Sequence, residues 1–196
     1  PGSQDFIIDD KFVPADRTCV IAEPPVEKGV LFNPRLFLVT LWVTTAGNAL
    51  GIARGAIDTF VDIALRDAST QSTALLRDRP HVQSRVGPAE AILNAARAYV
   101  VHAVDTAWQA VRDGEPDPSR KIADARLAIT HAIHEAVRVV DIIFHAAGTN
   151  AIYTRNPLER HFRDAHVAVQ HNSAFPVHYE SAGKVLMGLK PTDPGW

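Results

Sequence analysis

The feature that most constrains this chain is a long apolar run without charge. From Leu36 to Ala53 the sequence holds no charged residue, and the apolar segment continues to Asp67. A transmembrane helix needs about 20 mainly apolar residues, so the run approaches membrane length. Four polar residues interrupt it, namely Thr40, Thr44, Thr45 and Asn48. Because no basic flank marks an inside end and a helix that is apolar on all sides is usually an interior one, we predict the central helix of a bundle and no membrane span.

Two further amphipathic helices follow a polar connection at residues 68–80. Apolar residues recur every three or four positions from Ala89 to Val111, which predicts a helix that ends at Gly114. After a turn at 115–119, a similar stripe from Ile122 to Ile143 predicts a third helix, which ends at Gly148. Helices of roughly 30 residues are about 45 Å long. Because long helices with short links pack antiparallel, we predict an all-α, up-down bundle of the four-helix type.

The stretch from Ile142 to His171 joins the third helix to a fourth one. Gly148, Thr149 and Asn150 form a stop signal, because glycine adopts positive φ at no steric cost and asparagine tolerates it. Asn156 is a good N-cap, Pro157 suits the first helical position, and Glu159 has the spacing of a capping box. The pattern predicts a helix from Pro157 to His171.

Both ends of the chain differ from this helical body. Residues 5–14 alternate and then become apolar, which predicts one strand that ends at Pro14. A single strand cannot form a sheet, so its partners should lie on polypeptide outside this sequence. We therefore assign residues 1–35 to the end of a β domain and a linker, and 36–190 to a helical bundle domain. Residues 173–188 should form a last short helix, and 191–196 a frayed tail.

Composition excludes several function classes. A formal net charge of -2 and a pI near 6.5 indicate no excess of positive charge of the kind that binds nucleic acid. One cysteine, Cys19, cannot build a disulfide framework, which fits a reducing cytoplasm. His161, His166 and His171 recur every five residues and so spread around a helix, while His131 and His134 lack a carboxylate on their face. We therefore predict no metal site.

Several runs of residues resemble a known protein family. The C-terminal segment resembles that of the acyl-CoA dehydrogenase superfamily, in which a glycine turn, a Tyr-Thr-Arg and an Arg-Asp-Ala recur at this spacing. The matching positions are Gly148, Tyr153-Thr154-Arg155, Pro157, Glu159-Arg160 and Phe162-Arg163-Asp164-Ala165. Val82-Gln83-Ser84-Arg85 with Ala95-Ala96-Arg97 is similar to the helix after the family's central domain, and Asp5 to Asp16 to the exit strand of that domain. The resemblance covers nearly the whole chain, but the chain covers only the family's C-terminal half.

The resemblance implies a role for His171. Many acyl-CoA dehydrogenases carry a glutamate base nine residues after the arginine of Arg-Asp-Ala, which here is Asn172, and others carry it on the first long helix, where Leu41 to Ala46 holds no acid. Dehydrogenation of an acyl thioester needs a carboxylate base. The chain is more similar to the flavin-dependent monooxygenases of this superfamily, which place a histidine here, near the flavin. Imidazole suits proton transfer because its pKa lies near operating pH. His171 is therefore the candidate catalytic residue, with helix capping as the alternative.

The resemblance also implies flavin contacts and partners. The turn Ala147-Gly148-Thr149-Asn150 matches the loop that meets the flavin nucleotide of a neighbouring subunit in the family, and its small residues allow close backbone approach. Arg66 is the candidate phosphate contact, although the Phe-Gly pair that follows this arginine in the family is absent, which leaves FAD and FMN open. The family implies a homotetramer built as a pair of dimers.

Three functions remain open for the sequence. The first is the C-terminal domain of a flavin-dependent monooxygenase that acts on a small aromatic or otherwise bulky molecule, with reduced flavin from a separate reductase. The second is the same domain of an acyl-CoA dehydrogenase with a displaced base. The third is a helical oligomerisation module without chemistry of its own, since this fragment alone lacks the flavin-covering domains.

Overall fold

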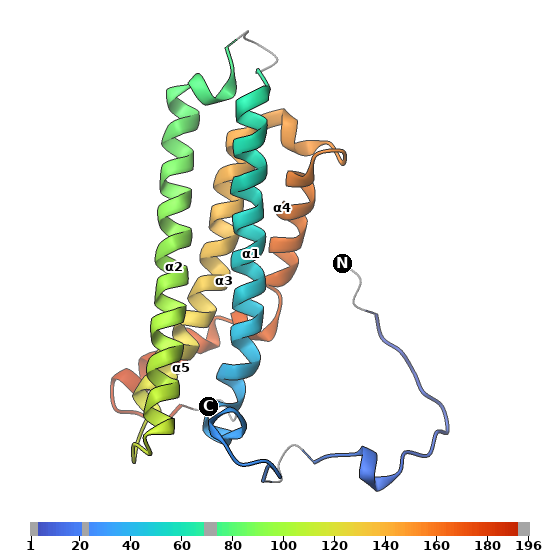
Figure 1. The fold of residues 1–196 in the computed structure, drawn as a ribbon, viewed down its shortest axis with the longest axis vertical. Coiled ribbons are helices and arrows are strands. Elements are labelled where there is room, and N and C mark those ends of the chain that lie inside the picture. Colours follow the sequence, from blue (N-terminus) through green and yellow to red (C-terminus); the bar gives the residue numbers. More distant parts are fainter. Residues whose placement is uncertain (1–3, 21–23, 69–73, 192–196) are drawn as a thin grey trace.

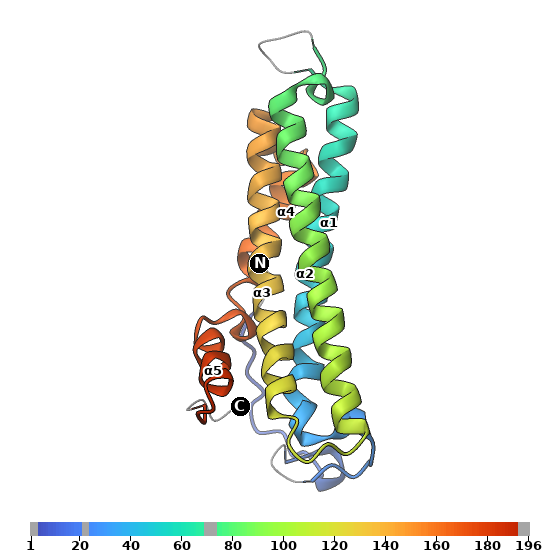
Figure 2. The ribbon, with the colours of Figure 1, turned by 90° about the vertical axis from the view of Figure 1, so that its left-hand side faces the viewer.

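The protein is a bundle of helices in the computed structural model, which describes residues 4–20, 24–68 and 74–191. The described α-helices are α1 (Phe37–Arg66), α2 (Pro80–Arg112), α3 (Ser119–Ala147), α4 (Pro157–Ala168) and α5 (Val177–Leu186). The first four run alternately up and down, with the shorter α4 against α1 and α3 (Figure 1 and Figure 2). Short 3-10 turns cover Ala15–Arg17, Val30–Phe32, Pro34–Leu36, Leu76–Asp78, Gly148–Ile152 and Asn172–Ala174. The predicted all-α, up-down bundle is confirmed.

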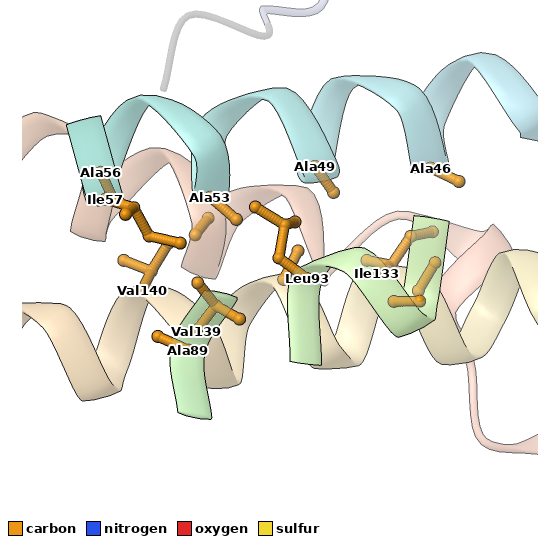
Figure 3. Close-up of a cluster of buried hydrophobic side chains, with 14 of the residues drawn as sticks. Ala46, Ala49, Ala53, Ala56, Ile57, Ala89, Leu93, Ile133, Val139 and Val140 are labelled. Atoms are coloured by element: carbon orange, nitrogen blue, oxygen red, sulfur yellow. The ribbon is translucent and has the colours of Figure 1, made fainter. Parts of the chain in front are cut away.

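The core combines small residues on α1 with branched residues on α3. Ala46, Ala49, Ala53 and Ala56 form one buried stripe on α1 and are at most 1% exposed. Figure 3 shows this stripe lying beside Ile133, Val139 and Val140 of α3 and Leu93 of α2. Small side chains let the helix axes approach closely while the branched ones fill the space between them. Because Ile133 is fully buried, its truncation to alanine should cost about 2–5 kcal/mol.

Helix α1 contains the uncharged apolar run from Phe37 to Ala53. By length and composition alone it is apolar enough to cross a membrane, but in the bundle it contacts α2, α3 and α4. The hydroxyl of Thr40 donates to the carbonyl of Leu36 at 3.1 Å, so one polar group of the run is satisfied within its own helix. Arg54 of α1 makes two hydrogen bonds to the Glu90 carboxylate of α2, at 2.8 and 2.7 Å. These contacts support the prediction of a bundle helix.

The predicted strand at residues 5–14 does not form. Residues 5–14 are exposed and hold no strand; within the described ranges the only β pairing is a single bridge between Ala68 and Leu75. A strand is held by hydrogen bonds to a neighbouring strand, and the described chain offers none to this segment. Within this segment Asp10 takes a positive φ of 47°, which a regular strand does not allow. The predicted tail lies outside the described residues except for Pro191.

Two local predictions near α4 were also inexact. The helix ends at Ala168, three residues before the predicted His171. Asn156 does cap it, because its Oδ1 accepts from the backbone N–H of Leu158 at 3.0 Å. The expected capping box is incomplete, since the Glu159 carboxylate pairs instead with Arg163 at 2.6 Å. The i,i+4 arginine competes successfully for this glutamate because both lie on the same helix face.

Candidate functional site

The turn after α3 has the conformation predicted from its glycine. Helix α3 ends at Ala147, and Gly148 takes φ of 57°, the left-handed region that favours glycine. No heavy atom lies within 4 Å of the position that a Cβ on Gly148 would occupy. Asn156, the cap of α4, also holds this turn, because its Nδ2 donates to the carbonyl of Asn150 at 2.7 Å. One asparagine thus fixes both the start of α4 and the backbone of the candidate flavin loop.

A first pocket brings two of the predicted cofactor residues together. Arg66, at the end of α1, and Asn150, in the turn, line one cavity of about 400 Å³. The Nε of Arg66 donates to the carbonyl of Asp62 at 3.0 Å, which leaves the rest of its guanidinium for other contacts. Arg155 stacks on the ring of Tyr153 at 4.3 Å. Tyr153 and Arg155 also line the pocket, together with Thr59, Asp62, Ile63, Asp67, Asn156 and Pro157.

A second, cationic pocket also borders this turn. It has a volume of about 250 Å³, and the whole predicted stretch Ala147 to Asn150 lines it. Its remaining lining residues are Leu76, Arg79, His81, Arg85, His145 and Ala146. Asn150 belongs to both pockets. Two arginines and two histidines without a carboxylate make this lining suited to an anion. His81 and His145 were missed from the sequence, because only the fold brings the start of α2 next to the end of α3.

His171 lies at a distance from this turn. Helix α4 has 12 residues, so it spans about 18 Å between the turn and the segment of His171. Figure 1 shows the turn at the upper end of the bundle and the end of α4 well below it. The structure therefore does not bring His171 together with Arg66 or Gly148 within one chain. It defines two separate regions on the same molecule.

His171 caps a short turn instead of a helix end. Its Nδ1 accepts from the backbone N–H of Ser173 at 3.2 Å and lies 2.8 Å from the Ser173 hydroxyl. The residue is exposed, whereas Ser173 is fully buried. The sequence analysis gave helix capping as the alternative role of His171, in which its side chain would donate to carbonyls at a helix C-terminus. Here the side chain accepts a hydrogen bond at the start of a turn. The segment that carries His171 is consequently well ordered by specific bonds.

The two positions at which family members carry a base are close together here. Asn172 follows His171, and its carbonyl lies 2.8 Å from Nε2 of His178. The His178 ring in turn lies 4.7 Å from the ring of Trp42, which is in the Leu41 to Ala46 region of α1. Both Trp42 and His178 are 4% exposed. Neither region carries a carboxylate, and the imidazoles of His171 and His178 are the titratable side chains described at this junction.

Two histidines of α3 pack against tyrosine rings. The ring of His131 lies 6.3 Å from that of Tyr99, and the ring of His134 lies 5.9 Å from that of Tyr179. Within the described ranges no group of three metal-ligating side chains converges. Burial lowers the pKa of His161, which lies 3.4 Å from the Thr59 hydroxyl at the contact of α1 and α4.

Known proteins are similar to this chain in sequence and in architecture. Residues 43–176 match the family described as acyl-CoA dehydrogenase, C-terminal domain. The chain is 33% identical over all of its 196 residues to indole-3-acetate monooxygenase of Acinetobacter baumannii, of which it covers 50%. It is 26% identical, over 98% of its length, to the oxygenase subunit HsaA of a flavin-dependent monooxygenase of Rhodococcus jostii, of which it covers 53%.

A solved structure agrees with these matches. The crystal structure of 3-HSA hydroxylase from Rhodococcus sp. RHA1 has a TM-score of 0.71 and 26% identity, over 81% of this chain and 40% of that one. The chain thus spans about half the length of the relatives it matches. Because the family match covers more than half of its residues, including the turn at Gly148 and His171, the chain belongs to the acyl-CoA dehydrogenase C-terminal domain family.

Proposed function

We propose that this chain is the C-terminal domain of a flavin-dependent monooxygenase that uses reduced flavin and oxygen on an aromatic or otherwise bulky small molecule. The matched indole-3-acetate monooxygenase and flavin-dependent oxygenase subunit support this activity. By the same analogy, a separate flavin reductase supplies the reduced flavin. Residues 1–35 are then the exit from the β domain that precedes the bundle in this family.

The observation that carries the proposal is the chemistry of the turn at 171–172. It presents an exposed imidazole and an amide, where a dehydrogenase would need a carboxylate. The second base position, on α1, likewise holds no carboxylate, and Trp42 there packs against the ring of His178. His171 has the proton-transfer group suited to oxygenation chemistry at neutral pH. Asn172 has none.

The cationic pocket fits a phosphorylated flavin, FAD or FMN. Arg79 and Arg85 would meet phosphate oxygens, and the open side of Gly148 would let the cofactor approach the backbone. Arg66 and Asn150 would hold the adjoining part of the nucleotide from the first pocket. When bound, the flavin supplies the oxygen-activating chemistry; the chain supplies the binding groups and the proton at His171.

The separation of the two regions supports a homo-oligomer. Because α4 alone places about 18 Å between them, the turn at Gly148 would serve the flavin of a neighbouring subunit, and His171 that of its own. Helix α1 also exposes Leu41 by 51% and Leu65 by 48% although it is the most apolar helix. We propose a tetramer, arranged as a pair of dimers and located in the cytoplasm, where the exposed thiol of Cys19 stays reduced.

Paired substitutions in the full-length enzyme that contains this domain test the proposal. His171→Ala should lower oxygen-dependent hydroxylation by roughly 100-fold or more, since proton transfer by a side chain commonly contributes that much. Asn172→Ala is the matched control and should have a much milder effect. Unchanged hydroxylation in His171→Ala would overturn the assignment. Robust acyl-CoA oxidation by the wild type would favour the displaced-base dehydrogenase, and the absence of any bound flavin would favour an oligomerisation module.

A further inference from the structure

Three consecutive carbonyls in the turn after α4 each meet a side chain from elsewhere in the fold. The hydroxyl of Thr130 donates to the carbonyl of Ser173 at 2.7 Å. The Nε2 of His134 lies 2.8 Å from the carbonyl of Ala174, and the Nε2 of His178 lies 2.8 Å from that of Asn172. Carbonyl oxygens only accept, so both histidines must carry a proton on Nε2. We call these three side chains the turn clamp.

Two of the three side chains of the turn clamp are buried, and His134 is half-buried. Thr130 and Ser173 are 0% exposed, and His178 is 4% exposed. Thr130 and His134 lie one turn apart on α3, so both project from one face of that helix. Burial makes each of these bonds costly to lose, because an unsatisfied buried polar group costs about 1–3 kcal/mol. The position of the Ser173 backbone is therefore set by α3 and α5, and not by the exposed loop around it.

Ser173 connects the turn clamp to the exposed imidazole of His171 through two contacts. Its backbone N–H points at Nδ1 of His171 at 3.2 Å, and its hydroxyl lies 2.8 Å from the same nitrogen. A backbone N–H can only donate, so Nδ1 must be the unprotonated acceptor of the neutral ring. The proton of neutral His171 then resides on Nε2, for which the described residues provide no hydrogen-bond partner. The imidazole presents a donor at its exposed edge.

We propose that Ser173 and Thr130 are positioning residues, which hold His171 in the tautomer that carries its proton on Nε2. Ser173 acts directly on Nδ1, and Thr130 acts through the carbonyl of Ser173. The catalytic consequence rests on the proposed monooxygenase function, but the tautomer does not. In that function His171 meets the reacting atoms as a hydrogen-bond donor.

Nitrogen NMR of the imidazole rings tests the tautomer in the 196-residue chain itself, without flavin. His171→Ala identifies the signals of His171 by subtraction. The wild type should show Nδ1 unprotonated and Nε2 protonated. Ser173→Ala keeps the backbone N–H but removes the hydroxyl, the second donor to Nδ1, so it should raise the population of the other tautomer. Thr130→Val, which keeps the shape but removes the hydroxyl, should act in the same direction. Thr130→Ser keeps the hydroxyl and should restore the wild-type spectrum. A wild-type ring protonated on Nδ1, or a spectrum unaltered in both Ser173→Ala and Thr130→Val, would overturn the proposal.

Turnover in the full-length enzyme tests the consequence. Ser173→Ala and Thr130→Val should lower kcat by about 2- to 10-fold, the worth of one hydrogen bond, with little change in KM, and Thr130→Ser should recover it. Equal loss of kcat in Thr130→Val and Thr130→Ser would reduce Thr130 to a packing role and reject its positioning function. A wild type that hydroxylates nothing would remove the proposed function, while the spectra would still decide the tautomer.

Discussion

The contact between Gly55 of α1 and His161 of α4 allows a stability prediction to be worked out in detail. A Cβ on Gly55 would lie 2.9 Å from Cε1 and 3.3 Å from Nε2 of the His161 ring. Carbon atoms pack at about 3.5–4.0 Å, so the ring or the helix must retreat by roughly 0.6 Å or more. Such overpacking costs about 1–3 kcal/mol, whereas alanine gains about 1 kcal/mol over glycine in a helix. Gly55→Ala should therefore be neutral to destabilising by about 2 kcal/mol.

Two glycines on the same helix serve as controls. Gly47 and Gly51 are exposed, and no atom lies within 4 Å of their virtual Cβ positions. Their replacement by alanine should stabilise the chain by up to about 1 kcal/mol in urea unfolding. The cost at Gly55 should disappear in a His161→Ala background, which a double-mutant cycle measures. If Gly55→Ala stabilised the protein as much as Gly47→Ala, the packing of α4 on α1 would be wrong.

Three further predictions concern pH, cofactor binding and association. Burial lowers the pKa of His161, so the unfolded state binds a proton at this residue more readily than the folded state does. The free energy of unfolding should therefore fall as pH drops below the reference pKa of about 6.5. His161→Gln should reduce this fall in thermal melts between about pH 5 and 7.5. Arg85→Ala in the full-length enzyme should weaken flavin binding by about 10- to 100-fold in fluorescence titrations, as for the loss of a charged hydrogen bond, and an unchanged affinity would place the phosphate elsewhere. Light scattering should show a tetramer at micromolar concentration that Leu41→Glu dissociates; a wild type that is only monomeric would contradict the association.

Much of the fold was accessible from the sequence because its helices are long and strongly patterned. The uncharged run became α1, and the glycine at 148 stopped α3 with the positive φ that was expected. The strand at 5–14 failed because strand formation depends on a partner, which no local pattern supplies. The end of α4 was misplaced because His171 belongs to a tighter turn, held by Ser173 and by side chains from α3 and α5.

The candidate site was predictable only in part. The resemblance predicted Arg66, the Gly148 turn and His171 as site residues. It did not predict the distance between the turn and the histidine, which is set by helix α4 in the structure. The cationic pocket combines Arg79 and Arg85 with histidines from another helix end, and such long-range pairing leaves no periodic signal. Likewise, the turn clamp joins α3 to carbonyls far along the chain, with separations of 43 positions for Thr130 and Ser173 and 40 for His134 and Ala174.

The most direct test of the central claim is the fate of molecular oxygen in the full-length protein that we propose contains this domain. The full-length protein, with its bound flavin reduced, is mixed with isotopically labelled oxygen and an aromatic substrate, and the product is analysed by mass spectrometry. A flavin-dependent monooxygenase should place one labelled oxygen atom in the product, and His171→Ala should lower the yield of this product while Asn172→Ala largely preserves it. Label found only in water or hydrogen peroxide, together with desaturation of an acyl-CoA by the oxidised protein, would contradict the account.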